Sequence, residues 1–95
     1  MPFAPLDPVL HNQLRLAVMS LLVGVDSADF NFLLERTGAT RGNLSVQISK
    51  LKEAGYIEVT KSFKDNYPNT SCRVSSTGLA AFEAYVAAIK GYLGK

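Results

Sequence analysis

The sequence has very few of the residues that build metal sites, disulfides and nucleophilic active sites. It contains one cysteine, Cys72, and one histidine, His11. A single cysteine excludes an intrachain disulfide, and a lone thiol fits the reducing cytoplasm. A Cys/His metal cluster cannot form, and no acidic run suggests a carboxylate site. We therefore expect no metal and no other cofactor, and we assign His11 no chemistry. A redox role for Cys72 stays open.

Long apolar runs and recognisable catalytic groups are also missing. The longest apolar stretches are too short to span a membrane, and the first residues lack the basic and apolar regions of a signal peptide. There are no carboxylates at a recognisable catalytic spacing and no glycine-rich phosphate loop. We expect a cytoplasmic protein that does not act on membranes and is not an enzyme.

The composition is that of a folded globular chain. Of the 95 residues, 47% are hydrophobic and 19% are charged. This length fits a single domain over residues 1–95, because two cores would not fit. Such a small domain buries a modest core, and dimerisation would bury more. The net charge of +2 permits nucleic-acid binding but does not require it.

Apolar residues spaced three and four apart predict a first helix after a proline-rich start. Pro2 and Pro5 favour an extended or turning chain, and Pro8 suits the first turn of a helix with Asp7 as its N-cap. The apolar spacing continues to residue 22, and Gly24 ends the helix.

Two further helices follow. The second spans residues 31–37, capped by Asp29 or Asn31 and ended by Gly38. The third opens at Thr40, whose hydroxyl is suited to accept the amide hydrogen of the residue at 43, and it closes at Gly55. Its apolar stripe consists of Leu44, Ile48 and Leu51.

The hydrophobic period then changes. Residues 56–63 are rich in β-branched and aromatic side chains and predict a strand, residues 64–69 a turn, and residues 70–74 the returning strand. Ser75 caps a last helix that runs to about Leu93. We therefore predict a mainly α fold with a small β-hairpin, in the order α-α-α-β-β-α. The stripe of the last helix is Leu79, Phe82, Val86, Ile89 and Leu93.

The stretch FNFLLERTGATRGNLSVQISKLKEAGYIEV, residues 30–59, resembles the helix-turn-helix of MarR/ArsR-like winged-helix regulators. The likeness is nearest to a compact archaeal and bacterial group of winged-helix DNA-binding domains. LDPVLHNQLRLAVM before it and VSSTGLAAFEAYV after it match the same group, so the resemblance covers roughly residues 6–93. It implies a winged helix-turn-helix that binds double-stranded DNA. The metal ligands of ArsR-like relatives are missing.

The third helix is the expected reading element, because a helix fits the major groove and base edges there carry a full donor and acceptor code. We expect Arg41, Asn43 and Gln47 to suit bases, and Ser45, Ser49 and Lys50 to suit phosphates or bases. The complete predicted set is Thr40, Arg41, Gly42, Asn43, Ser45, Val46, Gln47, Ser49 and Lys50.

A solvated helix face is the alternative for these residues. Two observations favour a role for this face in reading DNA. Ser45 and Ser49 are poor choices for a helix that only has to be stable. Acidic residues are also absent from Thr40 to Lys52 and return only at Glu53, as a surface that faces phosphates requires.

The hairpin is a second candidate DNA contact, because the resemblance makes it a wing. The predicted wing residues are Lys61, Lys64, Asn66, Asn69 and Arg73. The alternative is a solvated hairpin whose lysines discourage aggregation at a sheet edge. Asp65 weighs against DNA contact at the tip, and the side chain of Arg73 could instead point inward.

The apolar stripes of the first and last helices are broad enough to form a dimer interface. The alternative is that these two helices pack only on each other. The resemblance favours a homodimer, whose two reading helices would lie roughly 34 Å apart on a palindromic site. The predicted interface residues are Leu10, Leu14, Phe82, Tyr85, Val86, Ile89 and Leu93.

The sequence thus predicts a sequence-specific transcriptional regulator that acts as a homodimer on a palindromic operator. The alternative is a winged-helix protein-interaction module that does not bind DNA, which the modest net charge leaves open. A small-molecule effector of unknown identity could bind between the first, second and last helices, although no polar cluster marks a pocket there.

Overall fold

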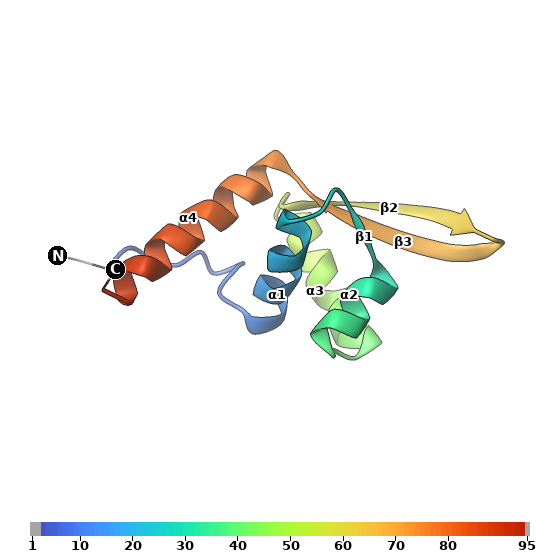
Figure 1. Cartoon of the computed structure of the whole chain (residues 1–95), viewed down its shortest axis with the longest axis horizontal. Coiled ribbons are helices and arrows are strands. Elements are labelled where there is room, and N and C mark those ends of the chain that lie inside the picture. Colours follow the sequence, from blue (N-terminus) through green and yellow to red (C-terminus); the bar gives the residue numbers. More distant parts are fainter. Residues whose placement is uncertain (1–2, 95) are drawn as a thin grey trace.

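The structure, a computed structural model, describes residues 3–94 as an elongated molecule with extents of 56 × 25 × 21 Å. Met1, Pro2 and Lys95 lie outside the described residues, and so does the expectation made for Pro2. In Figure 1 a long hairpin extends to one side of a body of three helices, and the last helix extends to the other. The elements are α1 (Gln13–Val23), β1 (Ala28–Asp29), α2 (Phe30–Thr37), α3 (Arg41–Glu53), β2 (Ile57–Lys64), β3 (Tyr67–Val74) and α4 (Ser76–Tyr92).

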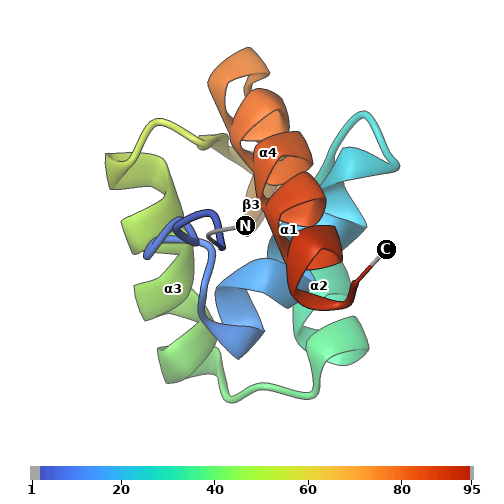
Figure 2. The ribbon, with the colours of Figure 1, turned by 90° about the vertical axis from the view of Figure 1, so that its left-hand side faces the viewer.

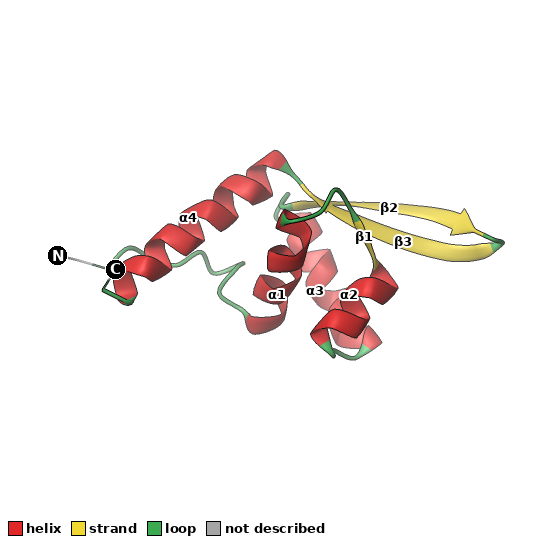
Figure 3. Ribbon diagram, in the orientation of Figure 1, coloured by secondary structure: helices red, strands yellow, loops and turns green. Residues whose placement is uncertain are grey.

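The predicted order is confirmed, with one added strand. β1 pairs antiparallel with β3, Ala28 opposite Cys72 and Asp29 opposite Ser71, so the sheet order is β1-β3-β2 (Figure 3). A strand of two residues shows no alternation, which is why the sequence pattern did not predict it. Asp29 then caps α2 by accepting from the Phe32 amide at 2.8 Å.

The predicted start of α1 was wrong. Asp7 does not cap it. Its carboxylate accepts from the Val9 amide at 2.8 Å within an isolated turn. The chain is extended at Asn12, and the Asn12 side chain caps α1 by accepting from the Arg15 amide at 2.9 Å. Both Asp7 and Asn12 are good capping residues, and the break between them belongs to a segment that places Leu10 fully inside the core.

The predicted end of α3 is confirmed, and its geometry turns the chain into β2. Gly55 has a φ of 79°, in the left-handed region that favours glycine. Its amide donates to the Lys52 carbonyl at 2.9 Å, and the Tyr56 amide donates to the Leu51 carbonyl at 3.0 Å. These two bonds form a Schellman motif, which satisfies carbonyls that a helix end leaves free.

The hairpin turn is shorter than predicted. Only Asp65 and Asn66 form it, with φ values of 53° and 69°, which are tolerable because Asp and Asn adopt the left-handed conformation more readily than other non-glycine residues. Lys64 and residues 67–69 therefore belong to strands. Pro68 is tolerated in β3 because β1 pairs only with Cys72 and Ser71, which leaves the outer edge of β3 unpaired near the tip.

The core lies where the three helices meet the base of the sheet. The predicted apolar stripe of α3 lies in this core and is confirmed. Cys72 is also buried, and burial raises the pKa of its thiol to about 11. The thiol therefore stays protonated at neutral pH. The buried apolar residues are Leu10, Val18, Met19, Leu22, Ala28, Leu33, Leu44, Ile48, Leu51, Ile57, Cys72 and Tyr85.

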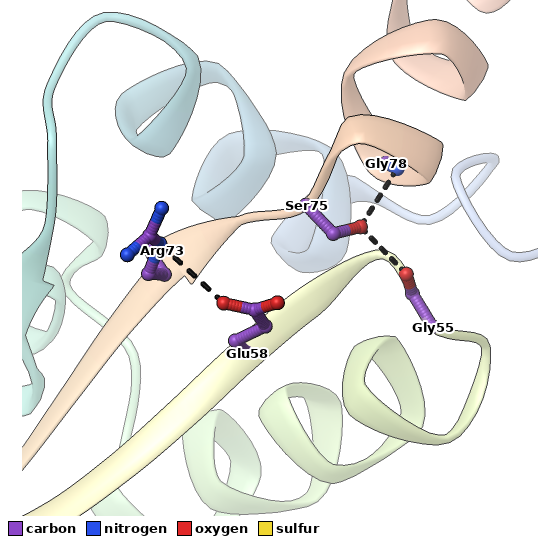
Figure 4. Close-up of polar contacts among 5 residues, drawn as sticks. All are labelled: Gly55, Glu58, Arg73, Ser75 and Gly78. Carbon is purple, nitrogen blue, oxygen red and sulfur yellow. Dashed lines mark hydrogen bonds and ion pairs between the residues drawn. The ribbon is translucent and has the colours of Figure 1, made fainter.

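α4 is attached to the body through its first turn (Figure 4). The Ser75 hydroxyl caps α4 by accepting from the Gly78 amide at 2.9 Å, and it donates to the Gly55 carbonyl at 2.6 Å. A Cβ atom on Gly78 would lie 2.0 Å from the Tyr56 carbonyl oxygen, so no side chain fits there. The helix start therefore lies directly on the backbone that follows α3.

The segment before α1 lies between α3 and α4 (Figure 2). The Tyr56 hydroxyl donates to the Asp7 carboxylate at 2.5 Å, and this bond raises the pKa of Tyr56 to about 12. His11 and Tyr85 are joined by a side-chain hydrogen bond of 3.0 Å. The Tyr92 hydroxyl donates to the Ala4 carbonyl at 2.8 Å. The segment is thus bonded both to α4 and to the end of α3.

Candidate nucleic-acid interface

The exposed side of α3 carries small side chains and no acidic residues along its first three turns. Its apolar stripe is buried, so Gly42, Val46 and Ser49 lie on the opposite side, and the Val46 side chain is 50% exposed. The Thr40 hydroxyl accepts from the Asn43 amide at 3.2 Å, as predicted. The first amides of a helix have no intrahelical acceptor and attract anions. Short side chains allow a polyanion to approach this surface closely.

A groove of about 300 Å³ lies between α3 and the hairpin. It brings the predicted residues Ser45 and Ser49 of α3 together with Lys61 of β2. Lys52 also lines this groove, although the sequence analysis did not select it. The spacing i, i+4, i+7 from Ser45 places Lys52 on the same flank of the helix, and that spacing was the available signal. Two ammonium groups thus border one groove.

A second groove, of about 440 Å³, lies at the start of α3 beside β3. Arg41 borders it together with Asn69, so the structure brings these two predicted residues together. The Arg41 guanidinium donates to the Asn31 side-chain oxygen at 3.2 Å and lies 5.7 Å from the centroid of the Phe30 ring. Arg41 is therefore held against α2, beside the groove that β3 also lines, and not over the middle of α3. Phe30 lines both grooves.

The other flank of α3 carries Asn43 and Gln47. They line a groove of about 420 Å³ together with residues of α1 and α2. The Gln47 side-chain amide donates to the Asn43 oxygen at 3.0 Å, and the Arg15 guanidinium donates to the Gln47 oxygen at 2.5 Å. Lys50 lies on this flank too, beside Pro8 and Arg15, and away from the hairpin.

Comparison with known proteins assigns the chain to a family. A family model described as a winged helix DNA-binding domain matches residues 14–93. The chain belongs to the winged helix DNA-binding domain family. It is also 31% identical over 78 residues to an uncharacterized protein of Methanocaldococcus jannaschii, with 82% of this chain and 85% of that protein covered. The family-level prediction from residues 30–59 is confirmed.

Solved structures show the same fold. A transcriptional regulator homologue from Pyrococcus horikoshii OT3 superposes with a TM-score of 0.84 at 24% identity, covering 90% of this chain and 85% of that one. The YusO protein from Bacillus subtilis superposes with a TM-score of 0.76 at 19% identity, covering 94% and 59%. HlyU from Vibrio cholerae gives a TM-score of 0.64 at 18% identity, covering 80% and 78%. These likenesses establish the winged helix fold.

Within this fold the hairpin is the wing, and its predicted residues divide between two faces. Opposite residues of antiparallel strands share a face, and successive residues alternate. Lys61 is therefore on the same face as Val59, toward α3, whereas Lys64, Asn69 and Arg73 are on the opposite face. The Arg73 guanidinium pairs there with the Glu58 carboxylate at 3.5 Å (Figure 4). Asn66 lies in the turn at the tip.

The residues predicted for the dimer interface differ in how far they are buried within the chain. Leu10 and Tyr85 are buried within the chain instead, at 0% and 6% exposed, because the segment before α1 packs against α4. Leu14, Phe82 and Ile89 are half-buried against the core. Val86 and Leu93 remain exposed, and Val86 shares a shallow apolar groove with Leu79, Phe82 and Val23. The residues of the predicted interface that stay exposed, Val86 and Leu93, thus lie on α4.

No group of three His, Cys, Asp or Glu residues within residues 3–94 could hold a metal ion. None of the described helices is both long and apolar enough to cross a bilayer.

Proposed function

We propose that this winged helix domain is a sequence-specific, double-stranded DNA-binding transcriptional regulator that acts as a homodimer on a palindromic operator. The observation that carries the proposal is the surface of α3. Its exposed side carries small side chains and no acidic residues along the first three turns, and one flank borders a groove lined by Lys52 of α3 and Lys61 of the wing. A helix that only stabilised the fold would need neither feature.

The proposed docking places α3 in the major groove, where base edges can be distinguished. Gly42 lets the start of the helix approach the backbone, and its free amides suit a phosphate. Val46 offers an apolar contact of the kind that thymine methyl groups accept. Asn43 and Gln47 contact bases on the flank away from the wing.

Phosphates would follow the groove between α3 and the wing. Ser45 and Ser49 provide hydroxyl donors there, and Lys52 and Lys61 provide charge. Arg41 extends this surface to the neighbouring groove beside β3, which Asn69 also lines. Regulation would be steric, because a bound domain excludes the transcription machinery from the same DNA.

The exposed apolar side of α4 supports the homodimer. Leu79 is 37% exposed and Val86 36%, and with Phe82 they border a groove that is largely apolar. A two-fold axis at this surface would repeat the α3 helices on one side of the duplex and impose a palindrome on the operator.

The decisive experiment is selection of bound duplexes from a random pool at a stated salt concentration, followed by titrations of the selected site from 50 to 200 mM salt. We expect a palindromic consensus and a linear fall of log K with log salt, with a slope of about 0.9 per phosphate neutralised. If no duplex is enriched at low salt, or if the affinity does not change with salt concentration, DNA binding is refuted and a protein-interaction module is favoured.

A further inference from the structure

The most exposed large apolar side chain in residues 3–94 is Phe63, which lies on the wing. It is 78% exposed and stands one residue before the end of β2. The hydrophobic core lies at the base of the sheet, so the ring contributes nothing to it. Aromatic residues favour strands, but this preference comes from packing against neighbours, which an exposed ring largely lacks. The fold alone therefore does not explain an aromatic ring at this position.

The pairing of β2 with β3 fixes the face on which the ring lies. Successive residues of a strand alternate between faces, so Phe63 shares a face with Val59 and Lys61. Both of these residues line the groove between α3 and the wing. The ring therefore lies on the side of the wing that would meet DNA, farther along the strand than Lys61.

The dimensions of B-form DNA place this ring at the minor groove. Two residues of a strand span about 7 Å, and the minor groove is about 6 Å wide. When α3 lies in the major groove, Lys61 meets a phosphate at the edge of that groove. A side chain about 7 Å farther along the wing then lies beyond this phosphate backbone, over the neighbouring minor groove.

The charges near the tip of the wing favour an apolar contact over an electrostatic one. Lys64 lies on the opposite face, and Asp65 carries the opposite charge in the turn that follows. Their charges cancel, so phosphates gain little from the tip. A ring that leaves water for stacked bases gains by burial of its apolar surface. The ring of Phe63 is thus the group at this end of the wing best suited to contact DNA.

Apolar side chains that enter the minor groove deform the duplex in a characteristic way. Phenylalanine, leucine and similar residues insert between two base pairs, partly unstack them and kink the duplex by about 20–90° toward the major groove. Pyrimidine–purine steps kink and unstack most easily. An inserted side chain therefore selects the sequence at the kink without a hydrogen bond to any base.

We propose that Phe63 is an apolar wedge: its ring inserts between two base pairs in the minor groove next to the α3 site, bends the operator and favours a pyrimidine–purine step there. The inference rests on the proposed DNA-binding function and adds a bend and an indirect source of specificity. The wing and α4 lie at opposite ends of the body (Figure 1). A dimer through α4 would therefore place one wedge at each outer flank of the operator.

The test measures the bend of one duplex, obtained by selection with wild type, in complex with wild type, Phe63→Leu and Phe63→Ala. Energy transfer between dyes at the two ends of the duplex reports the bend, and the fluorescence of 2-aminopurine at the outer flanks reports unstacking. Wild type is expected to bend the duplex by at least about 20° and to raise the fluorescence at the flanks. Phe63→Leu keeps the bend, because leucine is also a wedge side chain. Phe63→Ala loses most of the bend and binds about tenfold more weakly, as is usual when a ring stacked on a base is removed.

Tyr67→Ala is the matched control. Tyr67 is 75% exposed and pairs with Lys64 at the same end of the wing, on the face opposite to Phe63. Its truncation removes a similar aromatic surface and is expected to leave the bend and the affinity unchanged within error. Both rings lie outside the core, so the variants should fold, and thermal unfolding followed by circular dichroism verifies this.

A second duplex tests the indirect readout. In it, a stiff A-tract replaces the pyrimidine–purine step at each flank. Wild type is expected to bind this duplex more weakly than the first one, whereas Phe63→Ala should bind both alike. An equal loss of affinity for both proteins overturns the sequence preference.

The remaining outcomes are distinct. A straight duplex in the wild-type complex, or an unchanged bend with Phe63→Ala, overturns the wedge, leaves DNA binding standing and makes the exposed ring a contact for a protein partner instead. Equal losses with Phe63→Ala and Tyr67→Ala overturn it too, because the tip as a whole then contacts DNA. If wild type binds no duplex at low salt, the proposed function fails, and this inference with it.

Discussion

At the scale of single residues, Gly78 shows how closely α4 approaches the body. The nearest atoms to a Cβ at this position are backbone atoms of Tyr56, at 2.0 to 2.9 Å, and backbone cannot move aside as a flexible side chain can. Glycine is otherwise an unfavourable residue inside a helix. Its presence in the first turn of α4 is therefore explained by contact with Tyr56.

We predict that Gly78→Ala lowers the free energy of unfolding by about 1–3 kcal/mol or more, the usual cost of overpacking a tight site. Gly91→Ala is the matched control, because a Cβ there meets nothing within 4 Å. It should be neutral or stabilising by up to about 1 kcal/mol. Urea denaturation of both variants measures the difference. Equal stability of the two variants would contradict the close approach.

Residues also show where sequence reasoning succeeds. The caps at Thr40 and Ser75 and the stop at Gly55 were predictable because each acts on neighbours within five positions. The Arg15–Gln47 bond joins residues 32 positions apart, and no periodicity signals such a contact. Lys52 was not predicted, because the reading face was placed around Gly42, Val46 and Ser49 and was taken to end at Ser45 on this flank.

At the scale of elements, the wing presents two different faces. Lys61 lies in the groove beside α3, whereas Arg73 lies on the other face and pairs with Glu58. The sequence predicted the hairpin but put its turn over six residues, because Tyr67-Pro68-Asn69 looks like a loop. Strand pairing to the very tip overrides that local preference, and it lengthens the wing.

We predict that Lys61→Met weakens binding to every DNA sequence by a similar factor and lowers the salt slope by about 1, because it removes one phosphate contact. Arg73→Met should leave the slope within error, since its guanidinium faces away from the groove. Salt titrations of both variants on the same duplex measure this. A larger change in the slope for Arg73→Met than for Lys61→Met would place DNA on the opposite face of the wing.

At the scale of the whole molecule, the wing and α4 lie at opposite ends of the body (Figure 1). The order of the elements followed from composition, periodicity and resemblance, and the added strand β1 did not alter it. The division of α4 into a side facing the core and an exposed side did not follow from its sequence. Apolar residues lie on both sides of this helix. Packing in the structure buries Tyr85 and leaves its neighbour Val86 exposed.

We predict that Val86→Lys weakens self-association at least about tenfold, because it would bury a charge in the proposed apolar interface. Ala84→Lys is the matched control, as it adds the same charge at an exposed position of α4 that does not line the apolar groove. Sedimentation equilibrium measures both. If Val86→Lys associates like wild type, the dimer uses another surface or does not form.

The bond between Tyr92 and Ala4, together with stacking of the Phe3 and Tyr92 rings at 4.7 Å, has a practical consequence for protein engineering. It holds residues 3 and 4 beside the last turn of α4, the helix that extends away from the wing (Figure 1). An affinity tag or fluorophore at either end would therefore occupy the same corner, remote from the grooves beside α3. A short linker between the two ends would also suit a circular permutant reopened at Asp65 and Asn66, where the chain reverses in open solvent.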